Sequence, residues 1–162
     1  MTRVGLGFDS HPLVPGRRLI LGGVRIEHPM GLQGHSDADA LCHALIDALL
    51  GAAGLGDIGA HFPPGDARYK DADSVSMLKE AYARVKNRAL RLGNADATIY
   101  ADAPRLSPHR EAMCHTLATA LSVSPERINV KFKTLEGLSP TMGIQAIAVH
   151  TIVALEPIDA DH

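Results

Sequence analysis

The first residues of the chain alternate between large apolar side chains and glycine. Val4, Leu6 and Phe8 are separated by Gly5 and Gly7, and this period of two predicts a β-strand. We expect the three apolar side chains to face the core. The glycine face carries almost no side-chain volume, so we expect it to leave room for a ligand.

The spacing of apolar residues predicts the other elements. Leu41, Leu45 and Leu49 recur every four residues and form the buried stripe of a helix. Ser36 precedes this helix, with Asp39 at the capping-box position. We predict a hairpin or bulge around Gly22-Gly23 within residues 18–26. Helices are predicted over 37–53, 74–90 and 108–121, and further strands over 97–101, 128–134 and 146–155.

Glycine, serine and proline mark the ends of these helices. Gly54 is expected to end the first helix and Gly93 to stop the second. Ser107 is expected to cap the third helix, with Pro108 at its first position. The elements follow one another without a repeat or a long linker. We therefore predict one α+β domain over residues 1–162, a two-layer sandwich whose mixed sheet carries helices on one face. Its helix-free face would need covering, for which oligomerisation is the usual solution.

Composition and charge narrow the function classes. The chain has 162 residues, of which 46% are hydrophobic, and its net charge of -2 offers no general attraction to nucleic acid or to anionic membranes. The longest apolar stretch, around residues 44–55, is too short to span a bilayer. Cys42 and Cys114 form no C-x-x-C motif. With no signal or transit segment at the start, these features favour the cytoplasm.

Three residues have the chemistry of a metal site. Asp9 and His11 lie two apart at the end of the first predicted strand, so they point to the same face. His43 lies on the first predicted helix, one turn from both Asp39 and Asp47, either of which could orient its ring. If Asp9, His11 and His43 converge, they form a set that suits Zn²⁺ and leaves a fourth position open. The alternative is a strand-end cap and surface histidines beside solvated acids.

Further groups have the chemistry to bind phosphate. The run Gly34-His35-Ser36-Asp37 lies at the start of a predicted helix, where N–H groups favour an anion, although simple capping would also explain it. Arg105, in the loop 101–108, could neutralise a phosphate, and the backbone of that loop could contact a base edge; otherwise it is an ordinary loop. Lys133, Thr134 and Glu136 end a predicted strand, and Glu136 could hold Mg²⁺. The loop 56–66 could close over a substrate.

Several motifs occur together in one order along the chain. They are Gly5-x-Gly7-Phe8-Asp9-x-His11, His35-Ser36-Asp37-x-Asp39, His43-Ala44, Asp47-Ala48-Leu49-Leu50-Gly51-Ala52, Gly54-Leu55-Gly56-Asp57-Ile58-Gly59, Phe62-Pro63 and Lys131-x-Lys133-Thr134-x-Glu136-Gly137-Leu138. Over essentially the whole chain, this set closely resembles the 2-C-methyl-D-erythritol 2,4-cyclodiphosphate synthases. Each motif alone is weak, but their joint order and spacing are specific.

The resemblance implies a phosphorus–oxygen lyase of the non-mevalonate isoprenoid pathway. In that step, 4-diphosphocytidyl-2-C-methyl-D-erythritol 2-phosphate cyclises to the 2,4-cyclodiphosphate and releases CMP. The resemblance also implies a homotrimer with active sites between adjacent subunits. The nucleophile would be the substrate's own ionised 2-phosphate, so the reaction needs charge neutralisation and positioning rather than a general base.

Matching motifs assign the residues of this implied site. Asp9, His11 and His43 would hold one Zn²⁺ per active site, which polarises the attacked β-phosphate, and Glu136 would hold Mg²⁺ or Mn²⁺, which stabilises the departing CMP. The phosphate-aligning residues implied by the resemblance are His35 and Thr134. The implied substrate contacts are Asp9, Ser10, His11, His35, Ser36, Asp57, Ile58, Gly59, Phe62 and Asp66, toward the methylerythritol part, and Ala101, Ala103, Arg105, Leu106, Phe132, Lys133, Thr134 and Leu135, around the cytidine diphosphate.

The chain departs from the family pattern at three places. Lys133 stands where a threonine is common, which puts a cation beside the phosphates and predicts altered metal dependence, and Pro64 replaces an acidic residue. The run at 139–145 lacks the family's arginine. In the family this run lines a central cavity of the trimer, so its change argues against an isoprenoid diphosphate as a ligand there.

Two other function classes use the same residues. A zinc-dependent phosphohydrolase acting on a nucleotide diphosphate would give linear, hydrolysed products. A trimeric, metal-dependent binding module without catalysis would bind its ligand without turnover, and Lys133 and the missing arginine raise this alternative.

Overall fold

The computed structural model describes residues 1–137 and 145–158. All but the last residue of the 139–145 run, where the sequence departs from the family pattern, lie outside this part of the chain. Gln145 is described, and its carbonyl accepts a hydrogen bond of 2.8 Å from the backbone N–H of Leu13.

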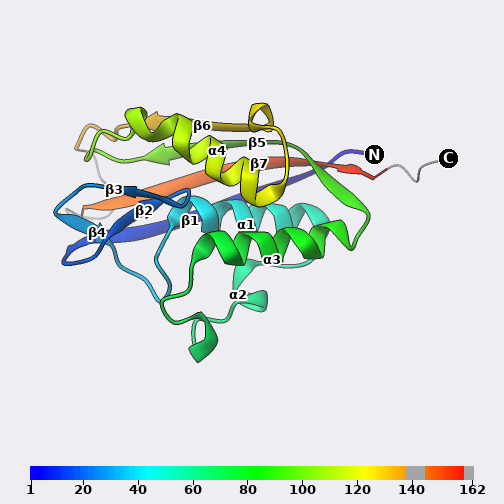
Figure 1. Cartoon of the computed structure of the whole chain (residues 1–162), viewed down its shortest axis with the longest axis horizontal. Coiled ribbons are helices and arrows are strands. Elements are labelled where there is room, and N and C mark those ends of the chain that lie inside the picture. The colour runs from blue at the N-terminus through cyan, green and yellow to red at the C-terminus, as the bar shows by residue number, and fades with distance from the viewer. Residues whose placement is uncertain (138–144, 159–162) are drawn as a thin grey trace.

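A mixed five-stranded sheet organises the fold (Figure 1). In spatial order its strands are β4 (Met30–Leu32), β1 (Arg3–Pro15), β7 (Ala146–Pro157), β5 (Leu90–Tyr100) and β6 (Ile128–Lys133). The neighbours β5 and β6 run parallel, and the other neighbouring pairs run antiparallel. β4 was not among the predicted strands, because three residues carry too little periodicity to be recognised.

The helices pack against one side of this sheet. α1 (Ala40–Ala53) lies against β1 and β7, α4 (Arg110–Leu121) lies against β6, and α3 (Ser74–Lys86) packs on both helices (Figure 1). The other elements are the hairpin β2 (Leu19–Leu21) and β3 (Val24–Ile26), the short helix α2 (Ile58–His61), and the 3₁₀ turns η1 (Ala67–Tyr69), η2 (Ser107–His109) and η3 (Pro125–Arg127). The α+β class and the mixed sheet are thus confirmed. Within the described residues, no helix combines the length and apolar character that crossing a membrane requires.

The two faces of β1 are the reverse of the prediction. Gly5 and Gly7 face α1 so closely that a Cβ added at Gly7 would lie 1.9 Å from the carbonyl oxygen of Ala44. The glycines therefore make room for a helix backbone and not for a ligand. Val4, Leu6 and Phe8 lie on the opposite face, where they are 52–69% exposed. The alternation was correctly recognised, but apolar character did not indicate which face is buried.

The boundaries of two helices also differ from those predicted. α1 begins at Ala40 because Asp39, and not Ser36, caps it by accepting the N–H of Cys42 at 3.0 Å. α3 ends at Lys86 and not at residue 90, because Ala89 adopts a left-handed conformation and the chain enters β5.

Three further positions have roles other than those expected. Gly93 lies inside β5, at the irregularity between Leu92 and Asn94, so it is not a helix stop. β5 itself starts at Leu90, whereas only its end, 97–101, was predicted. Ser107 begins the 3₁₀ turn η2 and provides no side-chain cap for the following helix.

The contact between β1 and α1 predicts a pair of opposite effects on stability. Gly7→Ala is expected to lower the free energy of unfolding by about 1–3 kcal/mol, because the new methyl group overpacks backbone against backbone. Gly51→Ala is the matched control within α1, where nothing lies within 4 Å of the added Cβ. It is expected to stabilise by about 0.5–1 kcal/mol through helix propensity. Urea unfolding of both variants measures this, and a neutral Gly7→Ala would contradict the close packing.

Candidate functional site

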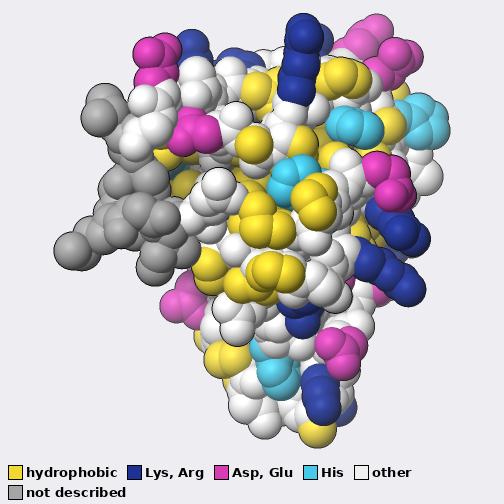
Figure 2. All heavy atoms as spheres, turned by 90° about the vertical axis from the view of Figure 1, so that its left-hand side faces the viewer, with side chains coloured by type: hydrophobic (Ala, Val, Ile, Leu, Met, Phe, Trp, Pro, Cys, Tyr) yellow, Lys and Arg dark blue, Asp and Glu magenta, His cyan; other side chains and the backbone are white. Residues whose placement is uncertain are grey.

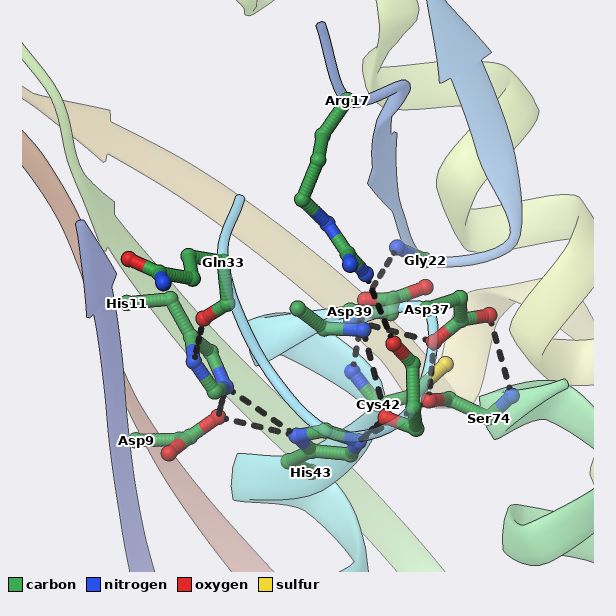
Figure 3. A network of polar contacts seen from close by, with 12 residues as sticks. Asp9, His11, Arg17, Gly22, Gln33, Asp37, Asp39, Cys42, His43 and Ser74 are labelled. Atoms are coloured by element: carbon green, nitrogen blue, oxygen red, sulfur yellow. Dashed lines mark hydrogen bonds and ion pairs between the residues drawn. The ribbon is translucent and has the colours of Figure 1, made fainter. Parts of the chain in front are cut away.

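Asp9, His11 and His43 converge at one point between β1 and α1 (Figure 3). Oδ2 of Asp9 lies 2.8 Å from Nε2 of His11 and 3.0 Å from Nδ1 of His43. The two ring nitrogens are 3.4 Å apart. Alternation along β1 directs both Asp9 and His11 to the α1 side, as expected. Among the described residues these three form the group of side chains that could hold a metal ion, and Glu136 is not in it.

Hydrogen bonds on the far side of each ring fix its orientation. Nδ1 of His11 lies 2.8 Å from the carbonyl oxygen of Gln33, which can only accept, so this nitrogen donates. Nε2 of His43 lies 2.9 Å from the hydroxyl of Ser74 and 3.1 Å from that of Ser36. Each ring therefore turns its other nitrogen toward Asp9.

The partners of His43 differ from those expected from its own helix. The carboxylate of Asp39 accepts the backbone N–H groups of Gly22, Gly23 and Cys42, and thus joins the β2–β3 hairpin to the start of α1. Asp47 accepts the N–H of Ile58 at 3.1 Å and fixes the start of α2. Ser74, which contacts the ring, comes from α3 and had no signal in the sequence.

Charge interactions bind this cluster together. Burial disfavours the charged carboxylate of Asp9, but the hydrogen bonds from His11 and His43 outweigh burial and hold the pKa of Asp9 well below its ordinary value. Burial likewise disfavours a charged His11, yet the hydrogen bond to Asp9 is strong enough, together with the carboxylate charge, to raise the pKa of His11. A carboxylate thus faces the inward nitrogens of two rings, and the nitrogen of His11 can exchange its proton for a cation.

The donor set fits a metal ion. A carboxylate oxygen and two imidazole nitrogens point at a common centre, and hydrogen bonds on the outer side of both rings hold them in place, as is usual for histidine ligands. Two histidines and one carboxylate suit Zn²⁺ and leave coordination free for a further ligand.

A cavity of about 280 Å³ opens beside this cluster. It combines the two histidines of the cluster and His35 with mostly apolar side chains from the chain after α1. Its lining residues are His11, His35, Ser36, His43, Ile58, Gly59, Phe62, Pro64, Tyr69 and Met77. The structure therefore brings five of the residues expected around the methylerythritol, His35, Ser36, Ile58, Gly59 and Phe62, next to the metal cluster.

Three other residues expected there, Ser10, Asp57 and Asp66, do not line this cavity. Asp57 caps α2 by accepting the N–H of Ala60 at 2.8 Å. Asp66 caps η1 and pairs with Arg68 at 2.6 Å, while its carbonyl oxygen lies 3.4 Å from Nε2 of His35. Ser10 lies on β1 between Asp9 and His11, and alternation directs it to the opposite face of the sheet.

A second cavity, of about 240 Å³, lies where β5 and β6 end. It is lined by Ile99, Ala101, Asp102, Pro104, Arg105, Leu106, Ser107, Phe132, Lys133 and Thr134. All of these residues except Ile99 come from the two segments expected to form the cytidine diphosphate pocket. Ala103 lies in the first of these segments and Leu135 ends the second. Glu136 directly follows Leu135.

Asp102, which was not among the expected site residues, organises the loop after β6. Its carboxylate accepts the hydroxyl of Thr134 at 2.6 Å and the N–H groups of Leu135 and Gly137 at 2.8 and 3.3 Å. The hydroxyl of Thr134 also accepts the N–H of Glu136 at 2.9 Å. The hydrogen bond from Thr134 and those from the backbone keep the pKa of Asp102 low.

The two cavities lie at the same level of the sheet but on different strands. Strand pairing places Asp9 opposite Val149, Val149 opposite Ile99, and Ile99 opposite Phe132. Three strand spacings separate the first residue from the last, which amounts to about 14 Å. None of the residues that the structure describes lines both cavities. Within one chain, the metal cluster and the Glu136 loop therefore lie at two separate places.

Comparison with known proteins adds a second line of evidence. Residues 2–156 match the model of the YgbB family. The chain is 57% identical over 153 residues to a 2-C-methyl-D-erythritol 2,4-cyclodiphosphate synthase of Moorella thermoacetica, an alignment that covers 94% of each protein. This protein belongs to the YgbB family. A Gloeobacter violaceus synthase of the same description is 53% identical over 154 residues, covering 95% of this chain and 94% of the relative.

Solved structures agree with the YgbB assignment. A 2C-methyl-D-erythritol-2,4-cyclodiphosphate synthase in a CDP-bound form matches with a TM-score of 0.87 at 42% identity, over 95% of this chain and 100% of that one. A Plasmodium falciparum IspF in complex with CDP matches with a TM-score of 0.84 at 30% identity, over 98% of this chain and 97% of that one. The predicted family is thereby confirmed.

The coupling of Asp9 to His11 predicts that metal binding depends on pH. Because the pKa of His11 is raised above its ordinary value near 6.5, its inward nitrogen is protonated more often at about pH 6 than at about pH 7.5, and a metal ion must displace that proton. Zn²⁺ affinity should therefore fall as the pH falls through this range, with more protons released per ion at the lower pH. Calorimetric titration in two buffers of different ionisation heat measures both quantities. An affinity independent of pH would contradict the assignment of His11 as a ligand.

Proposed function

We propose that this protein is a 2-C-methyl-D-erythritol 2,4-cyclodiphosphate synthase. It would convert 4-diphosphocytidyl-2-C-methyl-D-erythritol 2-phosphate into the 2,4-cyclodiphosphate and CMP, a step of isoprenoid biosynthesis. The convergence of Asp9, His11 and His43 in a chain that matches the family from residue 2 to residue 156 carries this proposal. We infer one synthase domain over residues 1–162. A cytoplasmic location fits Cys42 and Cys114, which are both free.

The proposed site holds two cations. Asp9, His11 and His43 would hold Zn²⁺, and Glu136 would hold Mg²⁺ or Mn²⁺ on the diphosphate. When bound, the cations supply positive charge that polarises the attacked phosphorus and stabilises the departing CMP. Because the attacking 2-phosphate is already ionised at neutral pH, the protein need not provide a general base.

The side chains of the protein would then bind and align the substrate. His35 and Ser36 line the cavity beside the metal cluster, with Phe62 as an apolar wall for the methylerythritol. Arg105 and Lys133 line the second cavity and would contribute positive charge near the diphosphate, while Thr134 would align the phosphates. Alignment of two anionic groups for attack is the main contribution that a protein makes to such a transfer.

Binding of the cytidine diphosphate part is proposed for the second cavity. Ala101, Ala103, Arg105 and Leu106 come from the strand-to-helix loop on one side of it, and Phe132, Lys133, Thr134 and Leu135 from the other. Two structural relatives are described as bound to CDP. Loop backbone groups in such a turn are suited to contact the edge of a base.

We further propose that the active form is a homotrimer, with each site shared by adjacent subunits. The metal cluster and the Glu136 loop, here named the half-sites, are about 14 Å apart in one chain, so they would face each other across a subunit boundary. The sheet face opposite the helices carries Val4, Leu6, Phe8 and Ile152, which are all more than half exposed in one chain. Burial of this apolar face between subunits would stabilise such an assembly.

Removal of one metal ligand tests the proposed reaction. His43→Ala should reduce CMP release at least about 100-fold, because two remaining ligands hold zinc poorly. Phosphorus NMR with the full substrate, Zn²⁺ and Mg²⁺ follows the cyclic diphosphate and CMP directly. His115→Ala, which changes an exposed histidine on α4, is the control and should be fully active.

The same experiment separates the alternatives. Linear products from the unmodified protein would favour the phosphohydrolase, and binding without product would favour the non-catalytic module. Full activity of metal-depleted His43→Ala protein would contradict the zinc assignment.

Mixed oligomers test the shared site. His43→Ala and Glu136→Gln damage different half-sites, so each variant alone should be inactive. If the two are unfolded together and refolded at equal amounts, random assembly gives about a quarter of the sites both intact halves, and about a quarter of the activity should return. A mixture as inactive as its components would show that both halves belong to one chain.

A further inference from the structure

We propose that Ser74 and Asp37 are positioning residues for the metal site. Hydrogen bonds that lead from Asp37 through Ser74 to His43, here named the relay, orient the ring of His43 for metal binding. The same two residues hold the segment that carries Phe62, Pro64 and Tyr69 next to that ring. Ser74 is the first residue of α3 and is fully buried, and Asp37 lies just before α1. Neither is a metal ligand in the proposed site. The inference rests on the proposed function, because it assumes that the Asp9, His11 and His43 cluster holds the ion.

The direction of the hydrogen bonds supports this role. The hydroxyl of Ser74 donates its proton to Oδ1 of Asp37 in a short hydrogen bond. Its oxygen is therefore left to accept from Nε2 of His43, 2.9 Å away (Figure 3). In the metal-loaded form, a neutral ring with its hydrogen on Nε2 would turn the lone pair of Nδ1 toward the ion, in place of the hydrogen bond that Nδ1 makes to Asp9 without metal. The relay thus selects the tautomer that a metal ion requires.

Ser36 alone would not fix the tautomer. Its oxygen lies 3.1 Å from the same nitrogen and also accepts the N–H of Ala38 at 3.2 Å. Within the described part of the chain, its hydroxyl proton has no carboxylate acceptor, so the ring nitrogen could act as donor or as acceptor. The carboxylate behind Ser74 removes this ambiguity.

Ser74 and Asp37 also hold in place the segment that leads from the cavity to α3. The N–H of Ser74 donates to Oδ2 of Asp37 at 3.1 Å, and the N–H of Asp37 donates to the carbonyl of Ala72 at 3.1 Å. One residue earlier, the N–H of Asp71 donates to the carbonyl of His35 at 2.9 Å. The segment that carries the cavity residues Phe62, Pro64 and Tyr69 is therefore anchored directly against the residues that precede α1.

Ser74→Ala removes the acceptor that Asp37 orients toward the His43 ring, while changing one buried atom and leaving the Ser36 hydroxyl in place. We expect the Zn²⁺ dissociation constant to rise about 10- to 100-fold, the range found when the orienting partner of a histidine ligand is lost. Competition with a fluorescent zinc chelator measures this without any turnover. The absorption spectrum of the Co²⁺-loaded protein should change as well, because the ring is less firmly oriented.

Three further variants make the test specific. Ser76→Ala is the matched control, because Ser76 lies in the same first turn of α3 and its hydroxyl bonds Asp73 rather than the cluster. Its zinc affinity should be unchanged. Ser74→Thr keeps the hydroxyl and should retain most of the affinity. Asp37→Asn keeps the shape of the relay but weakens its acceptor, so it should lie between the unmodified protein and Ser74→Ala, and it serves if Ser74→Ala does not fold.

The outcomes separate this inference from the proposed function. If Ser74 has only a structural role, Ser74→Ala would lower the melting temperature of the metal-free protein but leave its zinc affinity unchanged. That result would overturn the relay and leave the assignment of the metal cluster unaffected. Zinc affinity that survives His43→Ala would overturn the metal cluster itself, and the relay with it. A selective loss of affinity in Ser74→Ala, with Ser76→Ala unaffected, supports the relay.

Discussion

The close packing of α1 on β1 is the constraint on which the site depends. Gly5 and Gly7 bring the strand backbone against the backbone of the helix, and a single methyl group at either glycine would collide with a carbonyl oxygen of α1. Asp9 follows Gly7 by two residues, and His43 immediately precedes Ala44, the residue that contacts Gly7. The candidate metal-binding side chains from the strand and from the helix therefore meet because the two backbones have no side chains between them. In an ordinary helix-on-sheet packing, the same side chains would be held farther apart.

The two faces of the sheet differ in burial: one packs against the helices, and the other is exposed in a single chain. On the helix side, the core is built from α1, which is buried almost all round, and the ends of the strands open into two cavities. On the other side, apolar residues of β1 and β7 remain exposed in one chain. The proposed trimer would cover this face and would also bring a metal cluster and a Glu136 loop from different subunits together.

Part of this account could be predicted from the sequence. The α+β class, the three long helices and the family all followed from periodicity and from motif order, and Asp9 and His11 lie on one side of their strand as the alternation required. The buried face of β1 could not be predicted, because apolar side chains such as Phe8 normally indicate the core and the reason for the glycines lies 37 residues away in α1. The partners of His43 were missed for a similar reason. Asp39 and Asp47 are its neighbours by helical spacing, but Ser74 reaches it only through tertiary packing. Asp102 likewise acts on a loop that pairing of β5 with β6 brings beside it.

The central claim is that Asp9, His11 and His43 hold the catalytic metal. X-ray absorption at the zinc edge of the loaded protein tests it most directly, because the method identifies the ligand atoms. The account predicts two imidazole nitrogens and one or two oxygens at about 2.0–2.2 Å from the ion. A spectrum without imidazole scattering, or one with sulfur at about 2.3 Å, would contradict it.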